Sequence, residues 1–265
     1  MKLSISNIAW DVVYDNEMYQ FLSENGINGL EIAPTRIFTN NPYDQLSEAK
    51  LWSEELKKNH NLVIPSMQSI WFGHSELIFG SKEERNILIE YTKKAILFAD
   101  AIGCKNLVFG NPRNRDTDNI EGNMPIAIDF FKEIGDFAFE HNTYIALEPN
   151  PTIYNTRFMN RTEDAVEMAN KSNSKGIKVN ADLGAMLYNN EDINYLKQIT
   201  DYVNHIHISE PGLKLIENRT ELHLQLLEIC KEYYKDKFVS IEMGKQDIEY
   251  VKSTLLYLKK LTTKL

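Results

Sequence analysis

Short apolar runs typical of buried β-strands alternate along the whole chain with longer amphipathic stretches typical of helices. The apolar runs predict strands at Leu3–Ala9, Gly29–Ala33, Leu62–Ser69, Asn106–Gly110, Tyr144–Glu148, Ile177–Asp182, Val203–Ser209 and Phe238–Met243. The amphipathic stretches predict helices that begin near Asn16, Tyr43, Lys82, Asn123, Thr162, Glu191, Thr220 and Asp247. Each predicted strand is therefore followed by a helix, which is the repeating unit of a parallel α/β fold.

This alternation favours one closed (β/α)₈ TIM barrel over a doubly wound sheet. Eight strand–helix pairs suit a barrel, and a chain of 265 residues has the length of one such domain. A doubly wound sheet usually carries a glycine-rich turn after its first strand, whereas this chain reads Ala9-Trp10-Asp11 there. No linker rich in Pro, Gly or Ser interrupts the pattern. We therefore expect a single TIM-barrel domain over residues 1–265.

The last four predicted strands end in side chains that can bind a metal ion, namely Glu148, Asp182, His207 and Glu242. The carboxyl ends of parallel barrel strands open on one rim, so these side chains should converge there. Three carboxylates and one imidazole suit a divalent cation better than a structural zinc site, which favours cysteine. Mn²⁺ is the first choice, with Mg²⁺, Co²⁺ and Zn²⁺ as alternatives. Glu148 and Glu242 could also trade a proton with a substrate held between them.

The same residues stand in three motifs: Leu147-Glu148-Pro149-Asn150, Asn180-Ala181-Asp182-Leu183-Gly184 and His205-Ile206-His207-Ile208-Ser209-Glu210. Here the chain resembles the xylose-isomerase-like TIM barrels, usually described as sugar phosphate isomerases/epimerases, and within them the ketose 3-epimerases. The resemblance extends over nearly the whole chain. It implies a divalent metal bound by the two glutamates, Asp182 and His207. It also implies that Glu148 and Glu242 move the proton of a keto sugar or sugar phosphate through an enediolate.

The sequence departs from the family pattern at two places. Ala185 stands where many members have a histidine, three residues after the aspartate of the sixth strand. The run Glu210-Pro211-Gly212-Leu213-Lys214 stands where epimerases carry an arginine, and Lys214 is the candidate replacement. The reaction therefore stays open between isomerisation or epimerisation of a sugar and dehydration of a cyclic keto acid. A non-catalytic sugar-binding barrel that has kept the metal ligands is a further alternative.

Four polar side chains near the same rim are candidates for substrate binding. Glu31 and Gln68 lie near the ends of the second and third predicted strands, where they would either hydrogen-bond substrate hydroxyls or pair inside the rim. Arg113 and Arg115 follow the fourth predicted strand. One of these arginines would either clamp a phosphate or carboxylate of the substrate or stay solvated in its loop.

Aromatic residues follow the first and third predicted strands at the rim. Trp10, Trp71 and Phe72 would either stack on a sugar ring or pack beneath the loops. His205 stands two positions before His207. If His207 faces the barrel mouth, we expect His205 to face the surrounding helices and to be structural.

The composition and net charge of the chain limit the classes of molecule that it is expected to bind. The 38 acidic residues outnumber the 29 Lys and Arg residues, and the formal net charge of −9 repels nucleic acid. An apurinic-endonuclease-like site would also need a histidine-rich zinc cluster, and the chain has only six histidines. No run reaches the length of a membrane span or signal peptide, so we expect a cytoplasmic protein with a small-molecule partner. Cys104 and Cys230 are expected to be reduced thiols, and a homo-oligomer stays open.

Overall fold

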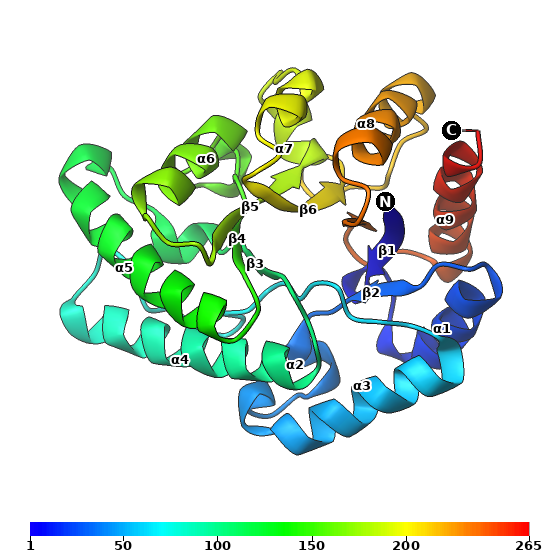
Figure 1. Cartoon of the computed structure of the whole chain (residues 1–265), viewed down its shortest axis with the longest axis horizontal. Helices are drawn as coiled ribbons and strands as arrows, with labels where there is room; N and C mark the ends of the chain where they lie inside the picture. Colours follow the sequence, from blue (N-terminus) through cyan, green and yellow to red (C-terminus); the bar gives the residue numbers. More distant parts are fainter. Residues whose placement is uncertain (265) are drawn as a thin grey trace.

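Seven parallel strands form one curled sheet in the computed structural model, which describes residues 1–264 (Figure 1). They are β1 (Lys2–Ser6), β2 (Gly29–Glu31), β3 (Leu107–Phe109), β4 (Ile145–Leu147), β5 (Ile177–Asp182), β6 (Val203–Ile208) and β7 (Phe238–Ile241). Their order across the sheet is β2-β1-β7-β6-β5-β4-β3. This is the cyclic order of a parallel barrel, interrupted between β2 and β3.

The segment predicted as the third strand, Leu62–Ser69, lies in this interruption without forming a regular strand. Val63 is bridged to β2, and Met67 is bridged to the residue after β2 on one side and to β3 on the other. Pro65 stands between the two bridged residues and has no backbone N–H, which prevents a continuous ladder. Seven of the eight predicted strands are confirmed. The third predicted strand, Leu62–Ser69, is present only as isolated bridges.

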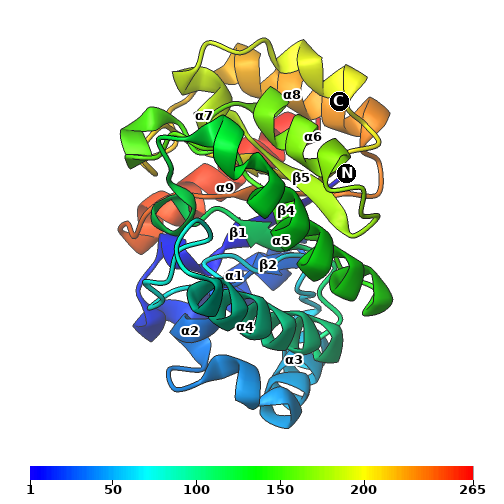
Figure 2. The same ribbon diagram turned by 90° about the vertical axis from the view of Figure 1, so that its left-hand side faces the viewer.

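The α-helices lie around the outer side of the sheet in both views (Figures 1 and 2). They are α1 (Asp15–Glu24), α2 (Pro34–Ile37), α3 (Leu46–His60), α4 (Lys82–Ala101), α5 (Ile120–Glu140), α6 (Thr162–Lys171), α7 (Leu183–Tyr188), α8 (Thr220–Tyr233) and α9 (Ile248–Thr262). The helix predicted near Glu191 is instead a 3₁₀ helix at Ile193–Gln198, which follows a left-handed turn at Asn190. None of the helices within residues 1–264 combines the length and apolar character that a bilayer span requires.

The interior of the curled sheet is lined by polar side chains, while the hydrophobic core lies between the strands and the helices. In β1, for example, the buried Ser4 and Ser6 alternate with apolar residues, and Ser4 hydrogen-bonds Ser240 of β7. Glu31 of β2 contacts His207 of β6, although β1 and β7 lie between these strands in the sheet. This contact therefore crosses the interior and places titratable groups inside it.

A buried histidine between α8 and α9 makes the stability of the fold depend on pH. His223 is 1% exposed, its Nδ1 lies 3.0 Å from the hydroxyl of Tyr257, and its Nε2 has no partner within residues 1–264. Burial, with a smaller contribution from Arg219, lowers the pKa of His223 to about 4. An unfolded histidine titrates near pH 6.5. Between about pH 4 and 6.5 the unfolded chain therefore binds a proton that the folded chain excludes.

The free energy of unfolding should consequently fall by about 1–2 kcal/mol through this residue as the pH decreases from 7.5 to 5, by linkage. Urea unfolding at the two pH values measures the change. His223→Gln cannot take up the proton, so it should remove this part of the pH dependence, whereas His141→Gln on the surface should retain it. An unaltered pH dependence in His223→Gln would contradict the assignment.

Candidate active site

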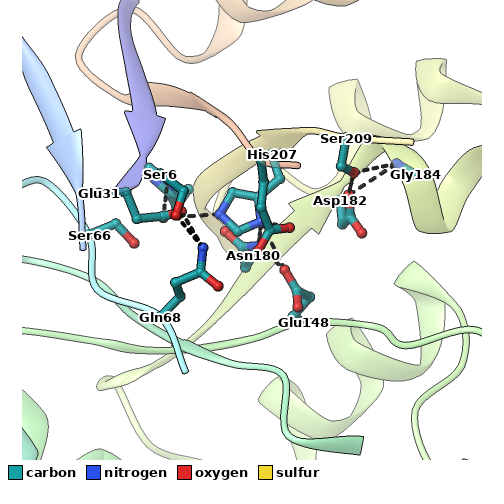
Figure 3. A network of polar contacts seen from close by, with 12 residues as sticks. Ser6, Glu31, Ser66, Gln68, Glu148, Asn180, Asp182, Gly184, His207 and Ser209 are labelled. Atoms are coloured by element: carbon teal, nitrogen blue, oxygen red, sulfur yellow. Dashed lines mark hydrogen bonds and ion pairs between the residues drawn. The ribbon is translucent and has the colours of Figure 1, made fainter. Parts of the chain in front are cut away.

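Three side chains that could hold a metal ion converge where strands end, and Figure 3 shows two of them, Glu148 and His207. Glu148 follows β4, His207 lies in β6 and Glu242 follows β7. Nδ1 of His207 is 3.0 Å from Oε1 of Glu148 and 3.2 Å from Oε2 of Glu242. All three side chains are buried, and one ligand atom from each lies within 4.8 Å of the other two. Carboxylate oxygens and an imidazole nitrogen are a donor set that Mn²⁺ and related divalent cations accept.

Asp182 closes β5 beside this group, but one of its oxygens is directed to the start of α7. Oδ1 of Asp182 accepts hydrogen bonds from the backbone N–H of Gly184, at 3.0 Å, and from the hydroxyl of Ser209 (Figure 3). Within residues 1–264, the cluster of mutually close ligand atoms does not include Asp182. The side chain nevertheless lines the same cavity as the two glutamates. Strand β5 thus places Asp182 next to the cluster of Glu148, His207 and Glu242, while the N-terminus of α7 holds its Oδ1.

The site concentrates negative charge around one imidazole. Burial lowers the pKa of a histidine, but the carboxylates of Glu31, Glu242 and Glu148 outweigh burial at His207 and raise its pKa well above the usual value. Burial raises the pKa of Asp182 to about 7, with further contributions from Glu148 and Glu242. Burial also raises the pKa of Glu242. Buried carboxylates that repel one another favour the binding of a cation between them.

A second buried group lies on the other side of His207. Oε2 of Glu31 is 3.0 Å from Nε2 of His207 and 3.1 Å from Nε2 of His205. Burial alone would raise the pKa of Glu31, but the two histidines reverse the shift and lower the pKa well below its usual value. These three residues could also hold a metal ion, but none of them lines the rim cavity described below. Glu31 therefore pairs inside the rim, which is one of the two alternatives that the sequence left open.

The position of His205 also corrects the sequence-based expectation. Neighbouring side chains of a strand point to opposite faces, so residues two positions apart share a face. His205 and His207 accordingly both point into the barrel, with their ring centroids 5.3 Å apart and their planes at 87°. The expectation that His205 faces the helices was wrong because it counted one position of alternation instead of two.

A cavity of about 290 Å³ opens over the two glutamates, a size that suits a small molecule. Its lining combines three carboxylates with amides and a few apolar side chains: Gln68, Ser69, Phe72, Val108, Gly110, Asn111, Pro112, Glu148, Asn150, Tyr154, Asp182, Leu213 and Glu242. No lysine, arginine or histidine lines it within residues 1–264. A larger cavity of about 610 Å³ lies near the strand beginnings at Asn106, Tyr144 and Phe238, and contains none of these three carboxylates. The chemistry therefore assigns the candidate site to the smaller rim cavity.

Residues that support Glu148 were missed by the sequence analysis. Nδ2 of Asn180 donates to Oε1 of Glu148 at 2.7 Å and lies 3.2 Å from Nδ1 of His207. Nδ2 of Asn150 lies 3.5 Å from Oε2 of Glu148. A Cβ at Gly110 would lie 2.9 Å from the same Oε2, so a larger residue there would displace the carboxylate. Asn180 could have been found, because it shares a strand face with the candidate ligand two positions later.

The arginines expected to clamp an anion do not line the cavity. Arg115 is fully buried, and its Nη2 donates to the backbone carbonyl of Glu148 and to Oδ1 of Asn150, each at 2.8 Å. Burial lowers the pKa of Arg115 to about 9. Arg113 is exposed. Arg115 thus holds the backbone that carries Glu148, which corrects its expected role as an anion clamp.

The two basic side chains considered in the segment after β6, Lys214 and Arg219, do not line the cavity either. Lys214, the candidate replacement for the epimerase arginine, is exposed and does not line the cavity. Arg219 pairs with the buried carboxylate of Glu210, with Nε–Oε1 and Nη2–Oε2 distances of 2.7 and 3.0 Å. This bidentate pair ties the two ends of the loop together.

The two tryptophans expected near the sugar are packing residues in this structure. Trp10 and Trp71 are each 1% exposed, and neither lines the cavity. Nε1 of Trp10 donates to Asp15 and Nε1 of Trp71 donates to Thr92, each at 2.8 Å. Phe72, in contrast, is 70% exposed and lines the cavity. The alternative of packing beneath the loops therefore holds for both tryptophans.

Comparison with known families and structures agrees with this architecture. The model of the xylose isomerase-like TIM barrel family matches residues 19–258. No curated protein matches the sequence. The apo form of 3-keto-D-glucoside 4-epimerase YcjR from E. coli has a TM-score of 0.78 and 18% identity, with 99% of each chain covered.

Two further solved structures share the fold. D-psicose 3-epimerase with D-tagatose from Clostridium cellulolyticum H10 has a TM-score of 0.72 and 13% identity, and the match covers 100% of this chain and 96% of that one. The probable 3-DHS dehydratase AsbF, involved in petrobactin synthesis in Bacillus anthracis, has a TM-score of 0.71 and 17% identity, with 99% and 98% covered. At these identities the likeness establishes a common fold.

Proposed function

The chain belongs to the xylose isomerase-like TIM barrel family, and we propose that it is a divalent-metal-dependent isomerase or epimerase of a keto sugar. The observation that carries the proposal is the pair of buried carboxylates, Glu148 and Glu242, which both line the cavity and lie 3.0 and 3.2 Å from Nδ1 of His207. The similarity to sugar epimerases over nearly the full chain supports this choice.

The residues of the site fit a divalent cation. Glu148, His207 and Glu242 already place their ligand atoms together, and rotation of the Asp182 carboxylate out of its helix cap would add a fourth ligand. Oxygen ligands with one imidazole, and no cysteine, favour Mn²⁺, with Mg²⁺, Co²⁺ or Zn²⁺ as alternatives. The cation would supply positive charge next to the oxygens of an enediolate.

The two glutamates would move the proton. One carboxylate would take the proton from the carbon next to the carbonyl, and the other, in its protonated form, would deliver its own proton to that carbon from the opposite face. Exchange of both carboxyl protons with solvent would then restore the starting state. Nδ2 of Asn180 fixes Oε1 of Glu148, and the guanidinium of Arg115 holds the backbone carbonyl of the same residue. These contacts orient Glu148, so that its position does not depend on the substrate.

Solvent exchange tests the reaction directly. The Mn²⁺-loaded protein, incubated with ketoses in D₂O, should place deuterium at the carbon next to the carbonyl, as mass spectrometry or NMR can detect, because the removed proton exchanges with solvent. Elimination of water from a cyclic keto acid, without exchange in any ketose, would replace this proposal by the dehydratase alternative. Binding of a ketose with neither exchange nor product would instead indicate a non-catalytic barrel.

A further inference from the structure

Phe72 presents an exposed aromatic ring at the cavity from an anchored turn. The neighbouring Trp71 is buried, and its ring lies 4.7 Å from that of Phe109 in an edge-to-face arrangement. The backbone N–H of Phe72 donates to the carbonyl of Ser69 at 3.0 Å, and Ser69 and Gly73 have φ values of 53° and 91°. The turn is therefore fixed by its anchor, and it keeps 70% of the Phe72 side chain out of the core.

A second apolar side chain reaches the same cavity from a strained turn. Leu213 has a φ of 53°, a conformation that is unfavourable for a branched side chain. Its N–H donates to the carbonyl of Glu210 at 3.0 Å, and its carbonyl accepts from the N–H of Gly244 at 2.9 Å. These two bonds hold the unfavourable conformation. Phe72 and Leu213 thus come from separate loops and give the cavity an apolar part beside its carboxylates.

The polar part of the cavity has acceptors and amides but, among the residues that the structure describes, no cationic side chain. Asp182 and the two glutamates bring the acidic groups, while Gln68, Asn111 and Asn150 bring amides. The buried Oδ1 of Asn111 has no hydrogen-bond partner within the described residues, so it can accept from a hydroxyl. A divalent cation bound here would be neutralised by the three carboxylates, so the site would offer no excess positive charge to a phosphate or carboxylate of a ligand. No guanidinium or ammonium among the described lining residues would supply that charge instead.

We infer that the site selects a neutral, unphosphorylated sugar, whose C–H face packs on Phe72 and Leu213 while its hydroxyls face the amides. This inference rests on the proposed function and adds the substrate class to it. Phe72 is then the residue that determines specificity for the neutral sugar, through contact of its ring with the apolar face of the sugar. A sugar phosphate and a cyclic keto acid are both disfavoured, because no lysine, arginine or histidine stands in the described lining of the cavity.

Matched pairs of ligands test the charge preference. Titration calorimetry on the Mn²⁺-loaded protein should show that free ketohexoses bind at least about tenfold more tightly than their 6-phosphates, since an uncompensated charge near carboxylates costs on the order of 1.4 kcal/mol or more. Equal or tighter binding of the phosphates would overturn the inference while leaving metal-dependent solvent exchange intact. Solvent exchange that fails with every ketose, despite tighter binding of the free sugar, would overturn the proposed enzymatic function but leave the charge preference standing.

Variants of Phe72 test the aromatic contact. Phe72→Ala should weaken binding of the free ketohexose and raise its KM by about three- to tenfold, the scale of an aromatic contact, with kcat changed less. Phe72→Tyr should restore binding. Phe139→Ala, which truncates a partly exposed ring on α5 that does not line the cavity, should leave KM unchanged. A wild-type KM and affinity in Phe72→Ala would overturn the role of the ring.

Discussion

Turnover should fall by at least about a hundredfold when either Glu148 or Glu242 is replaced by glutamine, because each would supply general acid or base catalysis that the other cannot replace. The two carboxylates reach the same cavity from different strand ends, so a substrate held there could meet both of them. Single-turnover and steady-state rates with the best ketose substrate measure the loss. Deuterium incorporation should fall in parallel, since removal of the proton precedes exchange with solvent.

Loss of metal must be separated from loss of the base. Metal content should therefore be measured for each variant, and the rates compared at a Mn²⁺ concentration that fills the site. Glu121→Gln, a change at an exposed position in the first turn of α5, serves as the matched control and should retain activity. If the metal-filled Glu148→Gln or Glu242→Gln variant keeps wild-type turnover, a mechanism with two essential glutamates is untenable.

The residues at the strand ends were predictable because the sequence pattern that marks them lies within a few neighbouring positions. A run such as Ile145-Ala146-Leu147 followed by Glu148 identifies a buried strand and the polar residue that closes it, and parallel strands bring such ends together. The capping of Asp182 onto α7 was not predicted. A second bond to the same oxygen comes from Ser209 after β6, which the sequence of β5 alone does not reveal.

The polar interior could not be predicted from periodicity. Glu31 and His207 are 176 positions apart and meet only because the sheet curls. Their contact fixes which atoms of His207 face which carboxylates, since Nε2 lies beside Glu31 and Nδ1 lies beside the other two glutamates. Likewise, the sequence gives Arg115 in a polar loop, whereas the structure buries it against backbone carbonyls. Local patterns do not show which loop side chains turn inward.

Mn²⁺ should raise the unfolding temperature, because a cation that binds only the folded chain stabilises it by linkage. At a free concentration of about 100 times Kd the linkage contributes roughly 2.7 kcal/mol. For a domain of this size the corresponding increase is roughly 5–10 °C. The physical cause is the relief of repulsion among Glu148, Asp182 and Glu242, which burial strengthens. Calorimetric scans in EDTA and in Mn²⁺ measure the shift.

Two variants separate a metal ligand from a residue that orients a ligand. Asp182→Asn should fold well without metal, because burial already raises the pKa of Asp182 to about 7, and it should lose most of the Mn²⁺ shift if this carboxylate binds the ion. Glu31→Gln keeps all proposed ligands but weakens the contact at Nε2 that orients the His207 ring with Nδ1 toward the two glutamates, so Mn²⁺ affinity should fall by about 10–100-fold. Mn²⁺ shifts equal to the wild-type shift in both variants would mean that the ion binds elsewhere. A wild-type affinity in Glu31→Gln alone would leave Asp182 as a ligand and remove the orienting role from Glu31.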